Sequence, residues 1–283
     1  MTKIDIICPL YNASKYINNL HKSFLIQENV NINNIRYVIT KGSDDTEKIV
    51  KKLDNCVYKV IEPKDFSHSY TREQEAFESD ADIIVFVTQD IIIKRKDWLF
   101  NLTKPIIEKE CVASYSRQIC TNNSIEKYTR ESNYPDKSQI VSKDDISKLG
   151  LKAFFFSDAS SAIKRETFVK LKGYDHKKLI INEDMYIAYK LITNGYKIKY
   201  CADSEVVHSH VFTLKQYYDR YKDTGKFFKE NSYLNNYKVN QAGGNMAKYI
   251  LKRAIQDKNF GVLVKYIPNM AVRFIGMEVG KIT

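Results

Sequence analysis

The 283-residue chain has few of the features that mark secreted or membrane proteins. Its five cysteines are scattered and form no CxxC pair, which argues against a zinc knuckle and against a disulfide framework and fits a reducing compartment. No stretch reaches the roughly 18 uninterrupted apolar residues of a membrane-spanning helix. The N-terminal residues 1–5 lead directly into a strand-like run and lack the apolar core of a signal peptide. We therefore expect a cytoplasmic protein.

The chain also has no internal repeat and no low-complexity linker, so its length indicates one large domain, or one domain with an appendage. Its composition, with 43% hydrophobic and 28% charged residues, is that of a soluble globular protein. The net charge of +11 is uneven, because residues 211–283 hold 13 Lys/Arg against 5 Asp/Glu. This basic region indicates an anionic partner, membrane lipid or nucleic acid, or else a solvated surface in a lysine-rich proteome.

Short apolar runs alternate with amphipathic stretches along the first third of the chain. We expect strands at 3–8, 35–39, 57–61 and 83–87, separated by helices at 13–24, 47–53 and 70–79. Strands and helices that alternate at this spacing predict an α/β fold with a doubly wound, mostly parallel sheet flanked by helices.

The run Asp82-Ile83-Ile84-Val85-Phe86-Val87-Thr88-Gln89-Asp90 organises this sheet. Five successive β-branched or aromatic residues predict a strand that is buried on both faces, in the middle of a parallel sheet. Ligands bind beyond the carboxyl ends of such strands, which is where Asp90 stands. The alternative is a carboxylate that only ends the strand or caps the next turn.

Beyond Asp90 the pattern predicts a helix at 97–110 and a strand at 112–118. Residues 121–148 are polar with few apolar anchors, which is typical of a long loop that serves as a lid or binding segment. The chain returns to the core at 154–163, and a helix at 185–193 and a strand at 196–200 follow.

Four side chains fall at strand or helix edges that such a sheet gathers on one side: Asp90, Glu183, Asp184 and His208. Asp90 and His208 can hold a divalent cation, Mg²⁺ or Mn²⁺, which would neutralise a pyrophosphate leaving group. Asp184 or Glu183 can then deprotonate an attacking hydroxyl. Alternatively, 182–184 is only a helix cap, and His208 and His210 point to opposite faces of an extended segment.

The C-terminal segment has two apolar faces at helical spacing, with lysines and arginines between them. The apolar positions are Ala247, Ile250, Leu251, Ala254, Ile255, Leu263, Ile267, Met270, Phe274 and Met277. This pattern is typical of a basic interfacial helix pair, and equally of helices packed on the domain's own core.

Six motifs resemble, in their order, those of family-two glycosyltransferases of the GT-A fold. They are Cys8-Pro9-Leu10-Tyr11-Asn12, Gly42-Ser43-Asp44-Asp45-Thr46, Thr88-Gln89-Asp90, Lys172-Gly173-Tyr174-Asp175, Asn182-Glu183-Asp184 and His208. Within that family, 66–73, 85–90 and 207–210, with Arg220, Tyr221 and Gly225 downstream, are similar to the bacterial rhamnosyltransferase-like members. The resemblance covers roughly residues 3 to 230.

The resemblance implies a role for each matching residue. Asp184 would be the base of an inverting reaction with Glu183 beside it, and Asp90 and His208 would hold the metal. The donor-binding residues would be Pro9, Tyr11, Asn12, Asp45, Arg72, Gln89 and Asp90, with Arg72 near the diphosphate. Three residues depart from the family pattern, namely Thr40, Ser69 and Glu73. They indicate either an unusual donor or an inactive relative.

The sequence therefore predicts a metal-dependent, inverting glycosyltransferase. We expect residues 1–210 to form the GT-A catalytic domain and residues 211–283 a basic helical region. The donor would be a nucleotide-diphosphate sugar, with dTDP-rhamnose as the first candidate. The acceptor would be a lipid-linked saccharide of capsule or O-antigen. Within this basic region, residues 243–283 would approach the inner leaflet of the plasma membrane.

Three other interpretations stay open. A nucleotidyltransferase should carry a glycine-rich, lysine-containing loop after the first strand, where this chain has Pro9-Leu10-Tyr11-Asn12. A catalytically impaired sugar-nucleotide-binding relative would explain the three departures. A nucleic-acid-binding protein is prompted by the pI of about 9.2, but no recognised motif supports it and we expect no nucleic-acid partner. The oligomeric state is not predicted.

Overall fold

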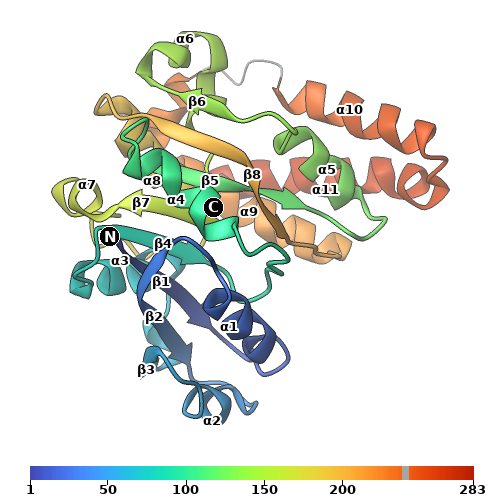
Figure 1. The fold of residues 1–283 in the computed structure, drawn as a ribbon. Helices are drawn as coiled ribbons and strands as arrows, with labels where there is room; N and C mark the ends of the chain where they lie inside the picture. The colour runs from blue at the N-terminus through green and yellow to red at the C-terminus, as the bar shows by residue number, and fades with distance from the viewer. Residues whose placement is uncertain (238–241) are drawn as a thin grey trace.

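The computed structural model describes residues 1–237 and 242–283, which form one mixed sheet with helices on both faces (Figure 1). The eight strands lie in the order β3-β2-β1-β4-β7-β5-β8-β6. β1 to β4 are mutually parallel, and among the strands of the described residues only β7 and β6 run antiparallel to their neighbours. The strands are β1 Lys3–Leu10, β2 Asn31–Thr40, β3 Cys56–Ile61, β4 Ile83–Val87, β5 Ala113–Ile119, β6 Gln139–Val141, β7 Ser160–Lys164 and β8 Ile198–Val207. The predicted α/β fold with a mostly parallel sheet is confirmed.

Two apolar layers hold the helices on this sheet. Helices α1 and α4 cover one face, and α3, α7 and α8 cover the other. The α-helices are α1 Ile17–Leu25, α2 Thr46–Val50, α3 His68–Glu78, α4 Trp98–Ile107, α5 Ile125–Asn133, α6 Ile146–Leu149, α7 Arg165–Lys170, α8 Glu183–Thr193, α9 Leu214–Glu230, α10 Ala242–Gln256 and α11 Phe260–Ile282. Short 3-10 turns lie at Pro63–Asp65, Lys143–Asp145, Gly150–Phe154 and Ser232–Asn236.

The central strand β4 has the predicted character. All five of its residues are buried, because β1 pairs with it on one side and β7 on the other while helices cover both faces. Asp90 therefore follows directly from the middle of the sheet, at the carboxyl edge where α/β proteins place their ligands.

The segment 121–148 is not the long loop predicted from its polarity. It contains α5, β6 and α6. Helix α5 buries Ile125 and Tyr128 against Ile250 and Val262 of the C-terminal helices. The prediction was wrong because these partners lie more than a hundred residues away, so a short apolar stripe that looks insufficient locally is completed by tertiary packing.

Strand β8 is also longer than the predicted strand at 196–200. β5 changes register between Ser116 and Arg117, and its last three residues then pair with β8 as far as Val207. The sheet thereby carries His208 to its rim, where the backbone N–H of His208 donates to Ile119 O at 2.9 Å.

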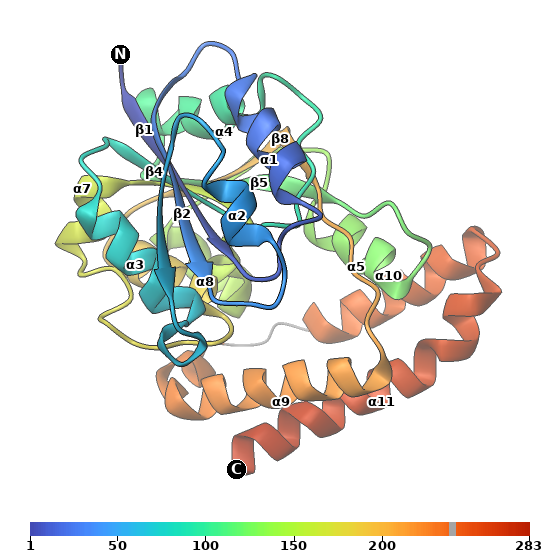
Figure 2. The ribbon, with the colours of Figure 1, turned by 90° about the horizontal axis from the view of Figure 1, so that it is seen from below.

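Helices α9 and α11 lie side by side below the sheet (Figure 2). Their backbones approach closely at Gly225 and Gly280, where a methyl group on either residue would overlap the facing helix. α10 packs on α5, and buried side chains of α5, α9, α10 and α11 form a third apolar cluster. This cluster crosses the predicted domain boundary at residue 210.

The apolar side chains of the C-terminal segment divide into a buried set and an exposed set. Ile250, Ala254 and Val262 are buried in the protein's own core. Another set of apolar side chains is exposed, namely Leu251, Ile255, Phe260, Val264, Ile267 and Phe274. Within the described ranges, no helix has both the length and the apolar character needed to cross a bilayer.

Candidate active site

A cavity of about 810 Å³ opens at the carboxyl ends of β1 and β4. Most of the residues predicted to form the site line it, namely Pro9, Tyr11, Arg72, Gln89, Asp90, Glu183, Asp184 and His208. Asn12 and Asp45 are not among its lining residues. The tertiary fold thus gathers the metal-binding, donor-binding and base candidates in one place, although they are spread over 200 positions of the chain.

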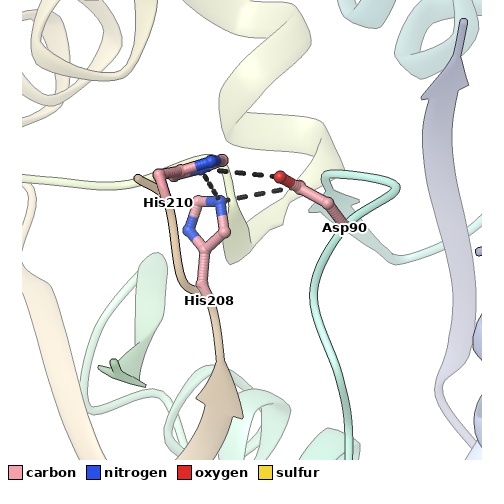
Figure 3. Close-up of side chains that lie close together, drawn as sticks. All are labelled: Asp90, His208 and His210. Atoms are coloured by element: carbon pink, nitrogen blue, oxygen red, sulfur yellow. Dashed lines mark hydrogen bonds and ion pairs between the residues drawn. The ribbon is translucent and has the colours of Figure 1, made fainter. Parts of the chain in front are cut away.

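Asp90, His208 and His210 converge inside this cavity (Figure 3). The Nε2 atoms of His208 and His210 each lie 3.5 Å from a carboxylate oxygen of Asp90, and 2.7 Å from each other. Three ligand atoms from two separate segments therefore face a common point, as a cation site requires.

His210 was not among the predicted metal ligands, and the alternative that places the two imidazoles on opposite faces is wrong. Residues i and i+2 of an extended segment share a face, so the spacing of the His-Ser-His triplet could have identified both imidazoles. The intervening Ser209 points elsewhere and accepts from Thr121 N at 2.9 Å.

The protonation states of this cluster suit a divalent cation. Burial lowers the pKa of His208, and burial with the neighbouring His208 lowers the pKa of His210 to about 4. Burial alone would raise the pKa of Asp90, but the neighbouring imidazoles of His208 and His210 outweigh it and hold the pKa low. At neutral pH the site presents one carboxylate and two neutral imidazoles, a donor set that fits Mn²⁺ better than Mg²⁺, which prefers oxygen ligands.

A second polar cluster occupies another part of the cavity wall. Glu183 and Asp184 open helix α8, and the guanidinium of Arg72 lies 3.2 Å from Glu183 Oε1. Burial first, and then the charges of Glu183 and Asp158, raise the pKa of Asp184 well above its ordinary value. A carboxylate with a raised pKa binds a proton more strongly, which is the property required of a general base.

Asp158 is a third carboxylate of this cluster, and the sequence did not single it out. It is buried and accepts hydrogen bonds from Tyr174 Oη at 2.6 Å and from Ser161 Oγ at 2.7 Å. Burial, reinforced by the charge of Glu183 and opposed by that of Arg72, raises its pKa. Asp158 precedes the antiparallel strand β7, so only the mixed pairing of the sheet brings it to the site.

Gln89 and Tyr11 join the ends of the two central strands. The Gln89 amide accepts from Tyr11 N at 2.8 Å and donates to Tyr11 O at 2.9 Å. Tyr11 lines the cavity and is 54% exposed. This double hydrogen bond holds the backbone of Tyr11 against the end of β4.

Asn12 and Asp45 make their contacts outside the cavity lining. Asn12 has a left-handed backbone, with φ of 46°, and its Oδ1 accepts from Ser43 N at 2.9 Å. Asp45 precedes α2 and pairs with Lys48 at the surface. Asp44, the preceding residue, holds the loop after β1 by accepting from Ser14 N at 2.9 Å.

Two of the three departures from the family pattern have structural roles. Glu73 accepts from the backbone N–H groups of Tyr174 and His176, and Ser69 Oγ accepts from Leu179 N at 2.7 Å. Both therefore fasten α3 to the segment 172–179 that leads into α8. The third, Thr40, is buried at the end of β2.

Comparison with known protein families decides the assignment. Residues 5–171 match the family model described as glycosyl transferase family 2. The chain belongs to this family. As a family-2 glycosyltransferase, it has the fold and the general activity that its motifs predicted.

Two curated relatives cover nearly all of this glycosyltransferase. The O-antigen chain rhamnosyltransferases RfbN of Salmonella typhimurium (strain LT2) and WbaN of Salmonella anatum are each 31% identical to it. Each alignment spans 99% of this chain and 90% of the relative.

Solved structures support the fold of the glycosyltransferase. The mannosyltransferase PcManGT from Pyrobaculum calidifontis, in complex with GDP-Man and Mn²⁺, superposes with a TM-score of 0.63 at 14% identity, over 99% of this chain and 86% of that one. TarS 1–349 of S. aureus, in complex with UDP-GlcNAc, gives a TM-score of 0.59 at 17% identity, over 88% of this chain and 71% of that one. At these identities the similarity establishes the fold.

Proposed function

We propose that this glycosyltransferase is metal-dependent and inverting, and that it transfers rhamnose from dTDP-rhamnose to a lipid-linked saccharide of the bacterial O-antigen. The names of the two relatives support the sugar and the acceptor. One observation in this chain carries the chemistry: the cluster Asp90–His208–His210 and the carboxylate of Asp184 line one cavity.

Asp90, His208 and His210 would hold Mn²⁺ in preference to Mg²⁺, and PcManGT, which shares the fold, is described with Mn²⁺. The bound cation supplies charge neutralisation for the diphosphate leaving group. Pro9, Tyr11 and Gln89 would hold the nucleoside, and Asn12 and Asp45 would act indirectly, through the loops that border it. Arg72, buried in the wall, would direct its positive charge toward both the diphosphate and the carboxylates.

Asp184 would act as the general base. Its ionised carboxylate takes the proton from an acceptor hydroxyl, whose oxygen attacks the anomeric carbon. The bond from that carbon to the diphosphate oxygen breaks on the opposite face, so the configuration inverts and both bonding electrons leave with the nucleotide. Glu183 would stay paired with Arg72 and keep the helix start in place.

An assay with dTDP-rhamnose, a lipid-linked acceptor and Mn²⁺ tests this proposal. Asp184→Asn should reduce transfer by at least about a thousandfold while leaving donor binding, measured by thermal shift, nearly unchanged. Asp203→Asn, an exposed carboxylate on β8, is the matched control. Wild-type turnover by the Asp184 variant, or a product with the donor's anomeric configuration, would refute the assignment.

The exposed apolar side of α10 and α11 suggests how the enzyme reaches a lipid-linked acceptor at the inner face of the membrane. Phe260, Val264, Ile267 and Phe274 are 68–78% exposed. Exposed lysines lie in the same two helices and in the turn between them, at positions 248, 252, 258 and 265. Apolar side chains beside lysines match an anionic lipid surface.

Point substitutions test this membrane contact better than truncation, because residues 243–283 include buried core residues such as Ile250. The variant Phe260→Ser/Ile267→Ser/Phe274→Ser should lose co-sedimentation with phosphatidylglycerol vesicles and keep its thermal stability. The control Val57→Ser/Tyr58→Ser, exposed on β3, should sediment like wild type. Equal binding by all three proteins would remove the membrane claim.

A further inference from the structure

We propose that Gln118 is a positioning residue that selects the tautomer of His208 with the proton on Nδ1, so that Nε2 presents a lone pair to the cation. The inference rests on the proposed metal dependence. Gln118 is buried near the end of β5, and its Oε1 lies 2.9 Å from His208 Nδ1. It lies on the side of the imidazole opposite to Asp90.

Arg130 determines which way the Gln118 amide points. Its Nη1 bonds to Gln118 Oε1, and a guanidinium carries only hydrogen-bond donors. The amide atom that faces Arg130 must therefore be the oxygen. The amide nitrogen turns to the other side and donates to Ser157 Oγ at 2.7 Å. The reverse orientation would place N–H groups of Gln118 against those of Arg130.

The orientation of the Gln118 amide in turn determines the tautomer of the His208 imidazole. Because Gln118 Oε1 can only accept, the proton it shares with His208 must belong to Nδ1. His208 Nε2 is then unprotonated where it faces Asp90 Oδ1 and His210 Nε2. Without this acceptor, the proton could move to Nε2 and be donated to Asp90, which would occupy the position that a cation needs.

The chain of contacts continues to the C-terminal helices. Arg130 lies on α5, which is anchored where Glu126 Oε1 lies 3.2 Å from Arg273 of α11 and 2.8 Å from Tyr217 Oη of α9. The packing of the C-terminal helices therefore holds Arg130 in place, and through Gln118 it affects the tautomer of His208.

Histidine ¹⁵N NMR on metal-free protein at pH 8 tests the tautomer directly, with His208 assigned from the signals missing in His208→Asn. Wild type should show His208 protonated at Nδ1. Gln118→Leu should lose that preference and bind Mn²⁺ about 10- to 100-fold more weakly, measured by calorimetry. Gln118→Glu keeps an acceptor opposite Arg130 and should keep both properties.

Arg130→Met is a second test, because it leaves Gln118 in place but frees its amide to rotate. This variant should also lose the preference of His208 for the tautomer protonated at Nδ1. A wild-type His208 protonated at Nε2, or an unchanged tautomer and Mn²⁺ affinity in both Gln118→Leu and Arg130→Met, would overturn the inference. The tautomer is measured without metal or substrate, so it stands or fails separately from the proposed sugar transfer.

Discussion

Arg72 of α3 and Glu183 of α8 form a buried ion pair, with 3.2 Å between Nη1 and Oε1, although 111 positions separate them in the chain. The same guanidinium donates to His68 O at 2.9 Å. It is the positive charge placed among the three carboxylates Asp158, Glu183 and Asp184. The pKa of Asp184 therefore depends on the charges of Arg72, Asp158 and Glu183, none of which takes part in the proposed proton transfer.

Replacing Glu183 by Gln should shift the acid limb of the pH–rate profile to lower pH. The rate should rise with pH as Asp184 loses its proton, and the negative charge of Glu183 raises the pKa of Asp184. Removing that charge lowers the pKa, so the base is available at lower pH. Initial rates of transfer under saturating Mn²⁺ give the profile, and Glu166→Gln, exposed on α7, is the control. A limb that stays in place or moves upward would contradict the coupling.

Replacing Arg72 by Met should have the opposite effect on the profile. The loss of the positive charge leaves the three carboxylates unopposed, so the acid limb moves to higher pH. Breaking a buried ion pair should also cost about 3–5 kcal/mol of unfolding free energy. Arg72→Lys keeps the charge, so it should shift the acid limb less and cost less unfolding free energy. Urea unfolding and the pH–rate profile measure the two effects, and an unchanged profile in Arg72→Met would exclude the proposed electrostatic role.

Glu73→Ala should loosen the turn before α8. Glu73 accepts from Tyr174 N and His176 N, and the backbone at Lys172, Asp175 and His176 is left-handed. Leaving the buried N–H of Tyr174 without an acceptor costs about 1–3 kcal/mol, so the turn should lose that stability. Hydrogen exchange should become faster at 172–179, whereas Glu78→Ala, exposed at the end of α3, should leave this segment unchanged. Equal exchange in both variants would show that Glu73 does not hold the turn.

Gly280→Val should separate α11 from α9. A side chain at Gly280 would overlap the carbonyl of Lys222, and overpacking of this kind costs about 1–3 kcal/mol or more. Because α11 carries Arg273 in the cavity wall, transfer should fall together with the melting temperature. Gly261→Ala, at the open start of the same helix, should be tolerated. A Gly280 variant with wild-type melting and activity would mean that the helices do not pack as closely as described.

Several parts of the site were predictable because they depend on local patterns. The apolar run of β4 predicts a buried strand, and the polar residues that follow it place Asp90 at the sheet edge. Glu183 and Asp184 were predicted as the acidic start of a helix, and His208 was noticed because it belongs to a pair of histidines. His210 was also accessible, since a period of two puts both imidazoles on one face.

Other parts depend on contacts between distant segments. Helix α5 is stable because α10 and α11 cover it, and α5 brings Arg130 to Gln118. Asp158 reaches the carboxylate cluster because β7 inserts antiparallel between β4 and β5. None of these contacts leaves a periodic signal in the nearby sequence.

The sequence by itself determined the parallel strands β1 to β4, the family motifs and the chemical groups available for transfer, because periodicity and residue type act over short distances. Only the tertiary structure decided which imidazoles meet Asp90, which carboxylates share Arg72 and which helix orients Gln118. These relationships depend on side-chain approach within 4 Å between segments that fold together only when the apolar cores are complete.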